Sequence, residues 1–219
     1  MMKRIIILLL CLVLLSGMSV SASEGREGKG RGSQEQTDAP DEEEIAAMAA
    51  AYEEGNPGVK AIAVKIKDIA NKFGTDPDYE KLFQEQLDTA EGGDRKAPRY
   101  VGLFYELGLG VEADTEEAVR YYETGVERGD LTSSYYLGLM YETGADPDYA
   151  KAAGLFASVE GSDNKSATGV VEAGYELAVL YEQGLGVERD LGKAKELYQE
   201  AAGYGCEEAA AALERLKEK

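Results

Sequence analysis

The chain has 219 residues, with 42 acidic and 23 basic side chains, and a formal net charge of −19. So acidic a chain argues against binding to nucleic acid or to an anionic membrane surface, because both need a basic patch. The sequence contains no histidine, which removes catalytic triads of the usual kind and histidine metal sites. We therefore expect no metal and no other cofactor.

Residues 1–22 are typical of a secretory signal peptide. Two basic residues precede a continuous apolar core, and the small residues Val20, Ser21 and Ala22 precede a plausible cleavage point. Cleavage before Ser23 would make the protein secreted or periplasmic. The alternative is an uncleaved N-terminal membrane anchor, although the apolar stretch is shorter than the roughly 20 residues that span a bilayer.

Residues 23–40 have no large apolar side chain and many charges. Such a segment cannot bury enough surface to order itself, so we expect a disordered linker. Residues 41–96 are interpreted as an N-terminal helical cap followed by a degenerate repeat. Within them, a helix is expected from Asp41 to about Glu54, and apolar residues at helical spacing predict a second helix over residues 59–73.

Three similar segments make up most of the remaining chain. They are Ala97–Gly129, Ser133–Gly161 and Ala173–Gly205, and in each a tyrosine is followed three residues later by a glycine. The copies are offset by about 36 and 40 residues. A period in this range indicates a solenoid, because one helical hairpin cannot bury its apolar face alone and neighbours must stack.

Each copy predicts two helices joined by a turn. The first helix carries an apolar stripe, and a small residue lies where a neighbouring helix must come close (Gly102, Gly138 and Ala178). The glycine after each tyrosine is expected to end this helix in a left-handed conformation (Gly108, Gly144 and Gly184). The second helices are predicted to be capped by Asp114, Asp146 and Asp190.

The repeated pattern Ala-x-x-x-Leu-Gly-x-x-Tyr-x-x-Gly-x-Gly-Val-x-x-Asp-x-x-x-Ala-x-x-Tyr-Tyr resembles a Sel-1-like repeat, a relative of the tetratricopeptide repeat. Residues 97–122 and 173–198 match it closely, whereas the middle copy lacks the Gly-x-Gly-Val loop and has Leu155-Phe156 for the aromatic pair. The resemblance implies an all-α fold, an α-solenoid of stacked antiparallel helix-turn-helix repeats, used for protein–protein contact and common in exported bacterial proteins. It implies no catalytic residues.

The repeats are therefore assigned to residues 97–205, and residues 206–219 are expected to form a C-terminal capping helix. This last segment is rich in helix-forming residues and ends in basic side chains. Cys206 is expected to be a small packing residue.

A second stripe on the first helices is the candidate binding site, here called the helix-A row. In repeat proteins of the resembling type, the first helices line the concave face. The row combines tyrosines, aliphatic side chains and glutamates: Arg99, Leu103, Glu106, Tyr135, Leu139, Glu142, Tyr175, Val179 and Glu182. An apolar strip bordered by acidic groups would suit a peptide or helix with basic residues. Alternatively, the aliphatic members pack against adjacent helices.

The sequence thus predicts an exported scaffold that binds another protein or a peptide through its concave helix-A face, and a partner with basic residues would suit that face. It does not predict an enzyme. Two alternatives are kept open, namely an envelope-tethering structural module and a hydrolase that uses paired carboxylates.

Overall fold

The structure is a computed structural model that describes residues 57–74, 77–165 and 169–217. The predicted signal peptide, the linker and the helix expected over residues 41–54 lie outside the described residues. All regular elements in the described ranges are α-helices, which confirms the all-α prediction. The chain divides between Pro77 and Asp78 into two units.

In the first unit, the described helix is α3 (Pro57–Phe73), which agrees with the helix predicted over residues 59–73. Its apolar spacing places Ala61, Ile66 and Ile69 in buried positions. The helix ends where Gly74 adopts a positive φ of 87°.

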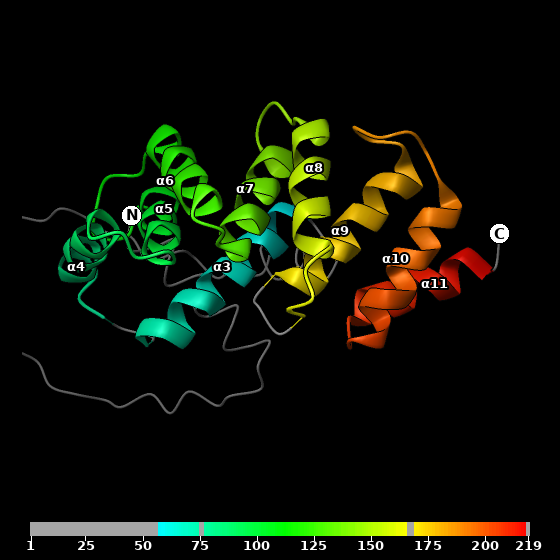
Figure 1. Cartoon of the computed structure of the whole chain (residues 1–219), viewed down its shortest axis with the longest axis horizontal. Helices are drawn as coiled ribbons and strands as arrows, with labels where there is room; N and C mark the ends of the chain where they lie inside the picture. Colours follow the sequence, from blue (N-terminus) through cyan, green and yellow to red (C-terminus); the bar gives the residue numbers. More distant parts are fainter. Residues whose placement is uncertain (1–56, 75–76, 166–168, 218–219) are drawn as a thin grey trace, which may run out of the picture. The chain divides into compact units, whose positions relative to one another are not determined.

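The second unit contains eight described helices that follow one another along a stack (Figure 1). They are α4 (Tyr79–Glu91), α5 (Ala97–Leu107), α6 (Thr115–Glu127), α7 (Leu131–Thr143), α8 (Tyr149–Glu160), α9 (Val170–Gln183), α10 (Leu191–Gly203) and α11 (Glu207–Lys217).

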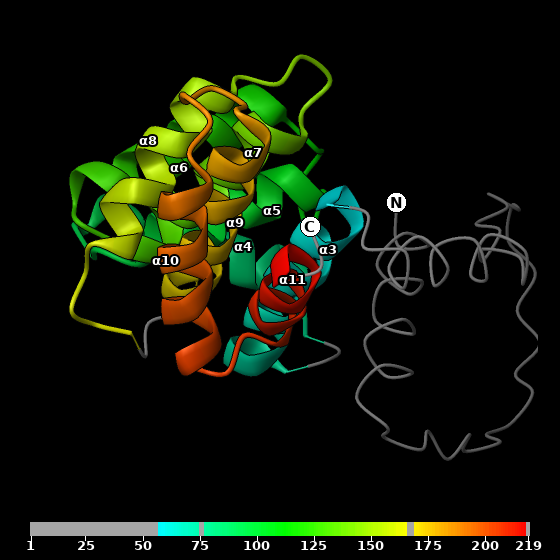
Figure 2. The same cartoon turned by 90° about the vertical axis from the view of Figure 1, so that its right-hand side faces the viewer.

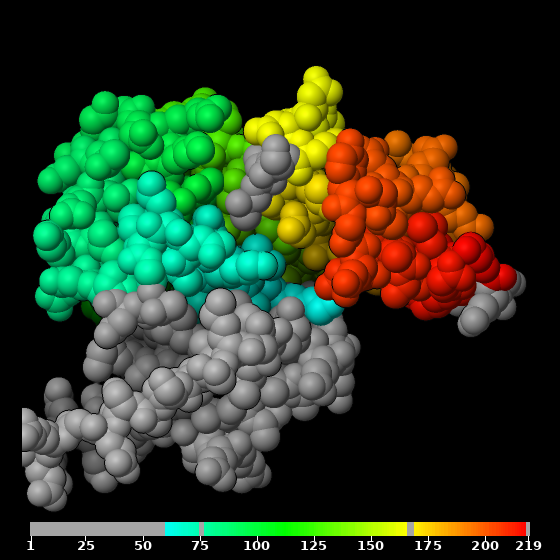
Figure 3. Space-filling model, turned by 90° about the horizontal axis from the view of Figure 1, so that it is seen from below, coloured from blue at the N-terminus to red at the C-terminus, as the bar shows by residue number. Residues whose placement is uncertain are grey.

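Each helix of this unit packs on the next one in the chain, and the repeats form two layers. Helices α5, α7 and α9 are the first helices of the three repeats, and α6, α8 and α10 are the second (Figure 2). Neighbouring first helices also touch, so that α7 contacts both α5 and α9. The space-filling view shows the C-terminal end of the stack, with α11 in red beside α10 in orange (Figure 3).

The turn inside each hairpin is closed by one repeated hydrogen bond. The backbone N–H of the aspartate that caps the second helix donates to the carbonyl of the repeat tyrosine: Asp114 to Tyr105 (3.0 Å), Asp148 to Tyr141 (2.8 Å) and Asp190 to Tyr181 (3.0 Å). The side chains of Asp114 and Asp190 also accept hydrogen bonds from backbone N–H groups of the first helical turn, which confirms both predicted caps.

The middle turn differs from the prediction at two positions. Asp148 rather than Asp146 caps α8, and its carboxylate accepts from the Lys151 N–H at 3.0 Å. The helix therefore begins at Tyr149, two residues later than the start at Pro147 that the predicted cap implies. Gly144 has φ −64° and ψ 169° and is therefore extended, whereas Gly108 and Gly184 are left-handed as predicted.

The second glycine of the Gly-x-Gly-Val loop is required by a contact with the preceding repeat. A Cβ atom on Gly110 would lie 2.3 Å from the carbonyl carbon of Tyr79, at the start of α4. A Cβ atom on Gly186 would lie 2.2 Å from the carbonyl carbon of Tyr149, at the start of α8. Both helices begin at a tyrosine that follows Asp-Pro-Asp in the sequence, so this loop and this helix start, here called Asp-Pro-Asp-Tyr, form a matched pair that occurs twice.

In the first two repeats, the small residue predicted in the first helix lies against an aromatic ring of the second helix. A Cβ atom on Gly102 would lie 2.9 Å from Cδ1 of Tyr122, and one on Gly138 would lie 2.5 Å from Cε1 of Phe156. Both rings are fully buried. The close approach of helix and ring compensates for the cost of a glycine inside a helix, which is about 0.5–1 kcal/mol.

Replacing Gly138 with leucine is expected to destabilise the protein by about 1–3 kcal/mol or more, because the Phe156 ring would have to move out of a packed core. Gly154→Ala is the matched control. Gly154 lies inside α8 of the same hairpin, and a Cβ atom there meets nothing within 4 Å, so this change should stabilise by about 0.5–1 kcal/mol. Urea unfolding followed by circular dichroism measures both; equal effects would contradict the register assigned here.

Candidate binding face

The structure places the helix-A row on the layer formed by α5, α7 and α9, and most of the row is not freely exposed. Arg99, Leu103, Tyr135, Leu139 and Glu182 are buried. Glu106, Glu142, Tyr175 and Val179 are half-buried. Leu103 and Leu139 are buried, as the alternative in which the aliphatic members pack against adjacent helices expects.

The glutamates of the row lie at equivalent positions, each two residues before the glycine that ends its helix. In the first repeat, the Tyr122 hydroxyl donates a hydrogen bond to Oε2 of Glu106 at 2.6 Å. In the last repeat, the Tyr198 hydroxyl donates to Oε2 of Glu182 at 3.0 Å. Two glutamates of the row are therefore bonded to the second helix of their own hairpin.

Glu182 has a further donor, because Nη2 of Arg215 lies 2.6 Å from the same oxygen. Glu142 in the middle repeat has neither kind of donor. Its Oε2 atom is buried and has no hydrogen-bond partner. Burial raises the pKa of the Glu142 carboxyl from its ordinary value of 4.5 to about 7, because removal from water disfavours the charged form.

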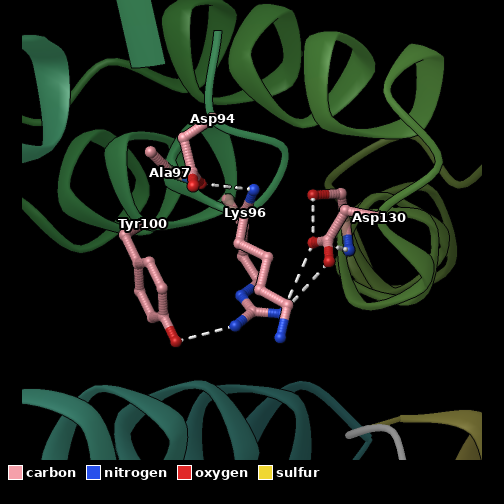
Figure 4. A network of polar contacts seen from close by, with 7 residues as sticks. Asp94, Lys96, Ala97, Tyr100 and Asp130 are labelled. Atoms are coloured by element: carbon pink, nitrogen blue, oxygen red, sulfur yellow. Dashed lines mark hydrogen bonds and ion pairs between the residues drawn. The ribbon is translucent and has the colours of Figure 1, made fainter. Parts of the chain in front are cut away.

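Arg99 belongs to a buried polar network that joins the first two repeats, and Figure 4 labels two of its partners, Tyr100 and Asp130. Its guanidinium lies 3.4 Å from the carboxylate of Asp130, which begins α7, and it donates to the Tyr100 hydroxyl at 2.7 Å. Asp130 also accepts from the backbone N–H and the hydroxyl of Ser133, at 3.1 and 2.9 Å. Arg99 is thus a structural ion-pair residue at the junction of two repeats.

Tyr135 marks the junction between α7 and α9. Its ring lies against Gly169, where a Cβ atom would approach Cδ1 of the ring to 2.3 Å. Burial raises the pKa of the Tyr135 hydroxyl well above its ordinary value, and the negative charges of Glu176, Glu172 and Glu142 add to this rise. Three carboxylates from two neighbouring first helices therefore act on one site. Glu142, Glu172, Glu176, Tyr175 and Val179 are called the α7–α9 face below.

The sequence pattern missed the residues that pair with the row. Asp130, Tyr122, Tyr198 and Arg215 were not assigned to the site, although the two tyrosines lie 16 residues after their glutamates in both outer repeats. That recurrence was available in the sequence, whereas the contact of Arg215 with Glu182 spans 33 residues and depends on how α11 packs.

Other parts of the described residues give weaker candidates for a functional site. No group of three or more cysteine, aspartate or glutamate side chains in the described ranges could hold a metal ion. A small pocket beside Lys165 is lined by Glu160, Glu200 and Tyr204, but the lysine is paired there, at 2.7 Å from the Glu200 carboxylate. Burial raises the pKa of the Cys206 thiol to about 11, so it is protonated at neutral pH. No described helix could cross a membrane by its length and apolar character.

Comparison with protein families finds a match between this chain and the Sel1 repeat. A model of the Sel1 repeat matches residues 98–130, 132–158 and 171–203, which are the three hairpins α5–α6, α7–α8 and α9–α10. Proteins with such repeats generally serve as protein–protein interaction scaffolds and are typically non-catalytic. A search of curated proteins finds no match.

Two solved structures show the same architecture. A Sel1 repeat protein from Oxalobacter formigenes has 29% sequence identity and a TM-score of 0.51, and the match covers 60% of this chain and 96% of that one. A protective antigen of uropathogenic Escherichia coli, which displays an SLR fold, has 22% identity and a TM-score of 0.56. That match covers 77% of this chain but only 35% of the antigen. The chain is therefore an all-α solenoid of helical repeats, and three of these repeats, between residues 98 and 203, match the model of the Sel1 repeat.

Proposed function

We propose that the protein is an exported scaffold that binds another protein, one with a basic contact surface, through the α7–α9 face. The Sel1 repeats support a protein partner. The observation that carries the choice of face is the gathering of Glu142, Glu172 and Glu176 around the buried Tyr135. A net charge of −19 would draw a basic partner toward such a face.

The chemistry of this face suits protein contact. Tyr175 and Val179 are half-buried and supply apolar area beside the carboxylates. The Tyr175 ring lies 5.8 Å from the Tyr198 ring, between centroids, which holds it in place. Aromatic anchors that are already ordered lose little conformational entropy on binding.

The test is capture of a partner from the envelope and culture medium of the source organism, with the full chain as bait. Glu172→Lys reverses one charge on the α7–α9 face. Glu196→Lys, the matched control, makes the same change on α10 of the other layer, where the Glu196 side chain is 73% exposed. We expect a partner that the wild type and the control retain and that Glu172→Lys loses. Equal retention by all three would move the binding face elsewhere, and no retained protein would contradict the scaffold function.

Export is proposed from residues 1–22 alone. N-terminal sequencing of the protein recovered from the envelope or medium should begin at Ser23. Recovery of a membrane-bound chain with an intact N-terminus would favour the anchored alternative.

A further inference from the structure

The three equivalent glutamates differ in which donors reach them. Glu106 receives the hydroxyl of Tyr122 and Glu182 receives that of Tyr198. Both tyrosines lie four residues after the buried alanine of the second helix, Ala118 or Ala194. In the middle repeat, that position is Phe156, four residues after Ala152. The ring is kept, as its contact with Gly138 shows, but the hydroxyl is missing.

A second donor position is defined by Arg215 in α11. The turn before α11 matches the turn before α7, because the N–H of Cys206 donates to the Ala201 carbonyl just as that of Asp130 donates to Gly125, at 3.1 and 2.9 Å. With this register, Arg215 is equivalent to Leu139 in α7. Leu139 in turn corresponds to Val179 in α9, the first helix of the repeat after the one that contains Glu142. Arg215 is therefore equivalent to Val179.

Both positions that could supply a donor to Glu142 are thus apolar. Phe156 occupies the position at which the outer repeats have a tyrosine. Val179 occupies the position in α9 that Arg215 occupies in α11. The result is a carboxylate with one buried oxygen that has no hydrogen-bond partner. An unpaired buried carboxylate oxygen is costly. Oε2 itself is covered, but Glu142 as a residue is only half-buried, so a cation from outside can approach the carboxylate group.

We propose that Glu142 is a receptor for one cationic side chain, a guanidinium or an ammonium group, of a partner protein. The contact of Arg215 with Glu182 is the internal example of this recognition, a guanidinium at 2.6 Å from the equivalent carboxylate. Glu172 and Glu176 add negative charge near the same site. This inference rests on the proposed function and narrows it to one group of the partner.

The probe is Nα-acetyl-arginine amide, and Nα-acetyl-citrulline amide is its neutral isostere. The side-chain carboxyl ¹³C resonance of Glu142 is followed at pH 8 in the full chain while each compound is added. We expect a saturable shift with the arginine compound, with a Kd on the order of 1–10 mM for a single ion pair. The citrulline compound should cause no saturable shift.

Two variants supply the missing donor from inside the protein. Phe156→Tyr restores the hydroxyl of the outer repeats, and Val179→Arg reproduces the position of Arg215. Each should weaken arginine binding at Glu142 about tenfold or more, because the internal donor occupies the carboxylate. Circular dichroism confirms folding, and Phe156→Tyr alone is sufficient if Val179→Arg fails to fold.

Three results would overturn the proposal: no saturable shift at Glu142 up to about 100 mM, the same response to both compounds, or wild-type binding by Phe156→Tyr. The scaffold function is tested separately. A partner that Glu172→Lys loses but that Phe156→Tyr binds with full affinity would keep the proposed function and exclude Glu142 as its receptor.

Discussion

Replacing Gly186 with alanine is expected to destabilise the protein by about 3–5 kcal/mol. Two costs add. The left-handed φ of 67° is unfavourable by about 1–2 kcal/mol for a residue with a Cβ atom. The Cβ atom would also lie 2.2 Å from the carbonyl carbon of Tyr149 and 2.4 Å from the Ala150 nitrogen. Both are backbone atoms of the first turn of α8, so the helix itself must shift.

Gly205→Ala separates the two costs. Gly205 has a φ of 94°, yet a Cβ atom there meets nothing within 4 Å, so this change should cost only the conformational part, about 1–2 kcal/mol. Urea unfolding of the full chain, followed by helical circular dichroism, measures both variants. A similar loss for Gly186→Ala and Gly205→Ala would show that the loop does not seat on α8 as described.

Replacing Glu142 with glutamine is expected to stabilise the protein at pH 8 by about 3 kcal/mol. The pKa of this carboxyl is about 7 in the folded protein and 4.5 as its ordinary value. Below pH 4.5 the group is protonated in both states and costs nothing. Between pH 4.5 and pH 7 only the unfolded chain releases the proton, so stability falls as pH rises. Above pH 7 the full penalty remains.

The measurement is the difference in unfolding free energy between wild type and Glu142→Gln from pH 4 to pH 8. It should be close to zero at pH 4 and grow to its full size near pH 8. Phe156→Tyr should recover part of the same gain by giving the carboxylate a donor. Glu196→Gln, at an exposed position, is the control and should show no such trend. A constant difference across the range would mean that Glu142 has an ordinary pKa.

Much of the fold could be predicted because the repeat imposes the same local demands several times. The glycines at 108 and 184 and the caps at Asp114 and Asp190 recur at fixed spacing, and the structure confirms them. The middle turn was predicted from the recurring glycine and from the sequence Asp-Pro-Asp, and the prediction was wrong at Gly144 and Asp146. Its loop is two residues shorter between tyrosine and cap, so the chain leaves α7 in an extended conformation.

The candidate site was less predictable than the fold. Helical spacing identifies which residues share a face of α5, α7 or α9 but not which partner each side chain finds. Glu182 was placed in the row by spacing alone, whereas its bond to Arg215 depends on the packing of a helix 33 residues further on. Glu142 has an unpaired oxygen because two neighbouring positions, Phe156 and Val179, carry no hydrogen-bond donor. The sequence does not show that these two positions matter to Glu142, because the contacts of the equivalent residues Tyr198 and Arg215 with Glu182 become visible only when the repeats are compared in three dimensions.

The matched pair formed by the Gly-x-Gly-Val loop and the Asp-Pro-Asp-Tyr helix start has a consequence for lengthening the protein. Because the pair occurs at α4 with Gly110 and again at α8 with Gly186, the natural module is two hairpins rather than one. Insertion of a duplicated double hairpin would present every such loop with the helix start that it fits. Insertion of a second α9–α10 hairpin alone would set its loop against the start of α10, which has another sequence. Arrays that multiply this loop should therefore be lengthened by two hairpins at a time.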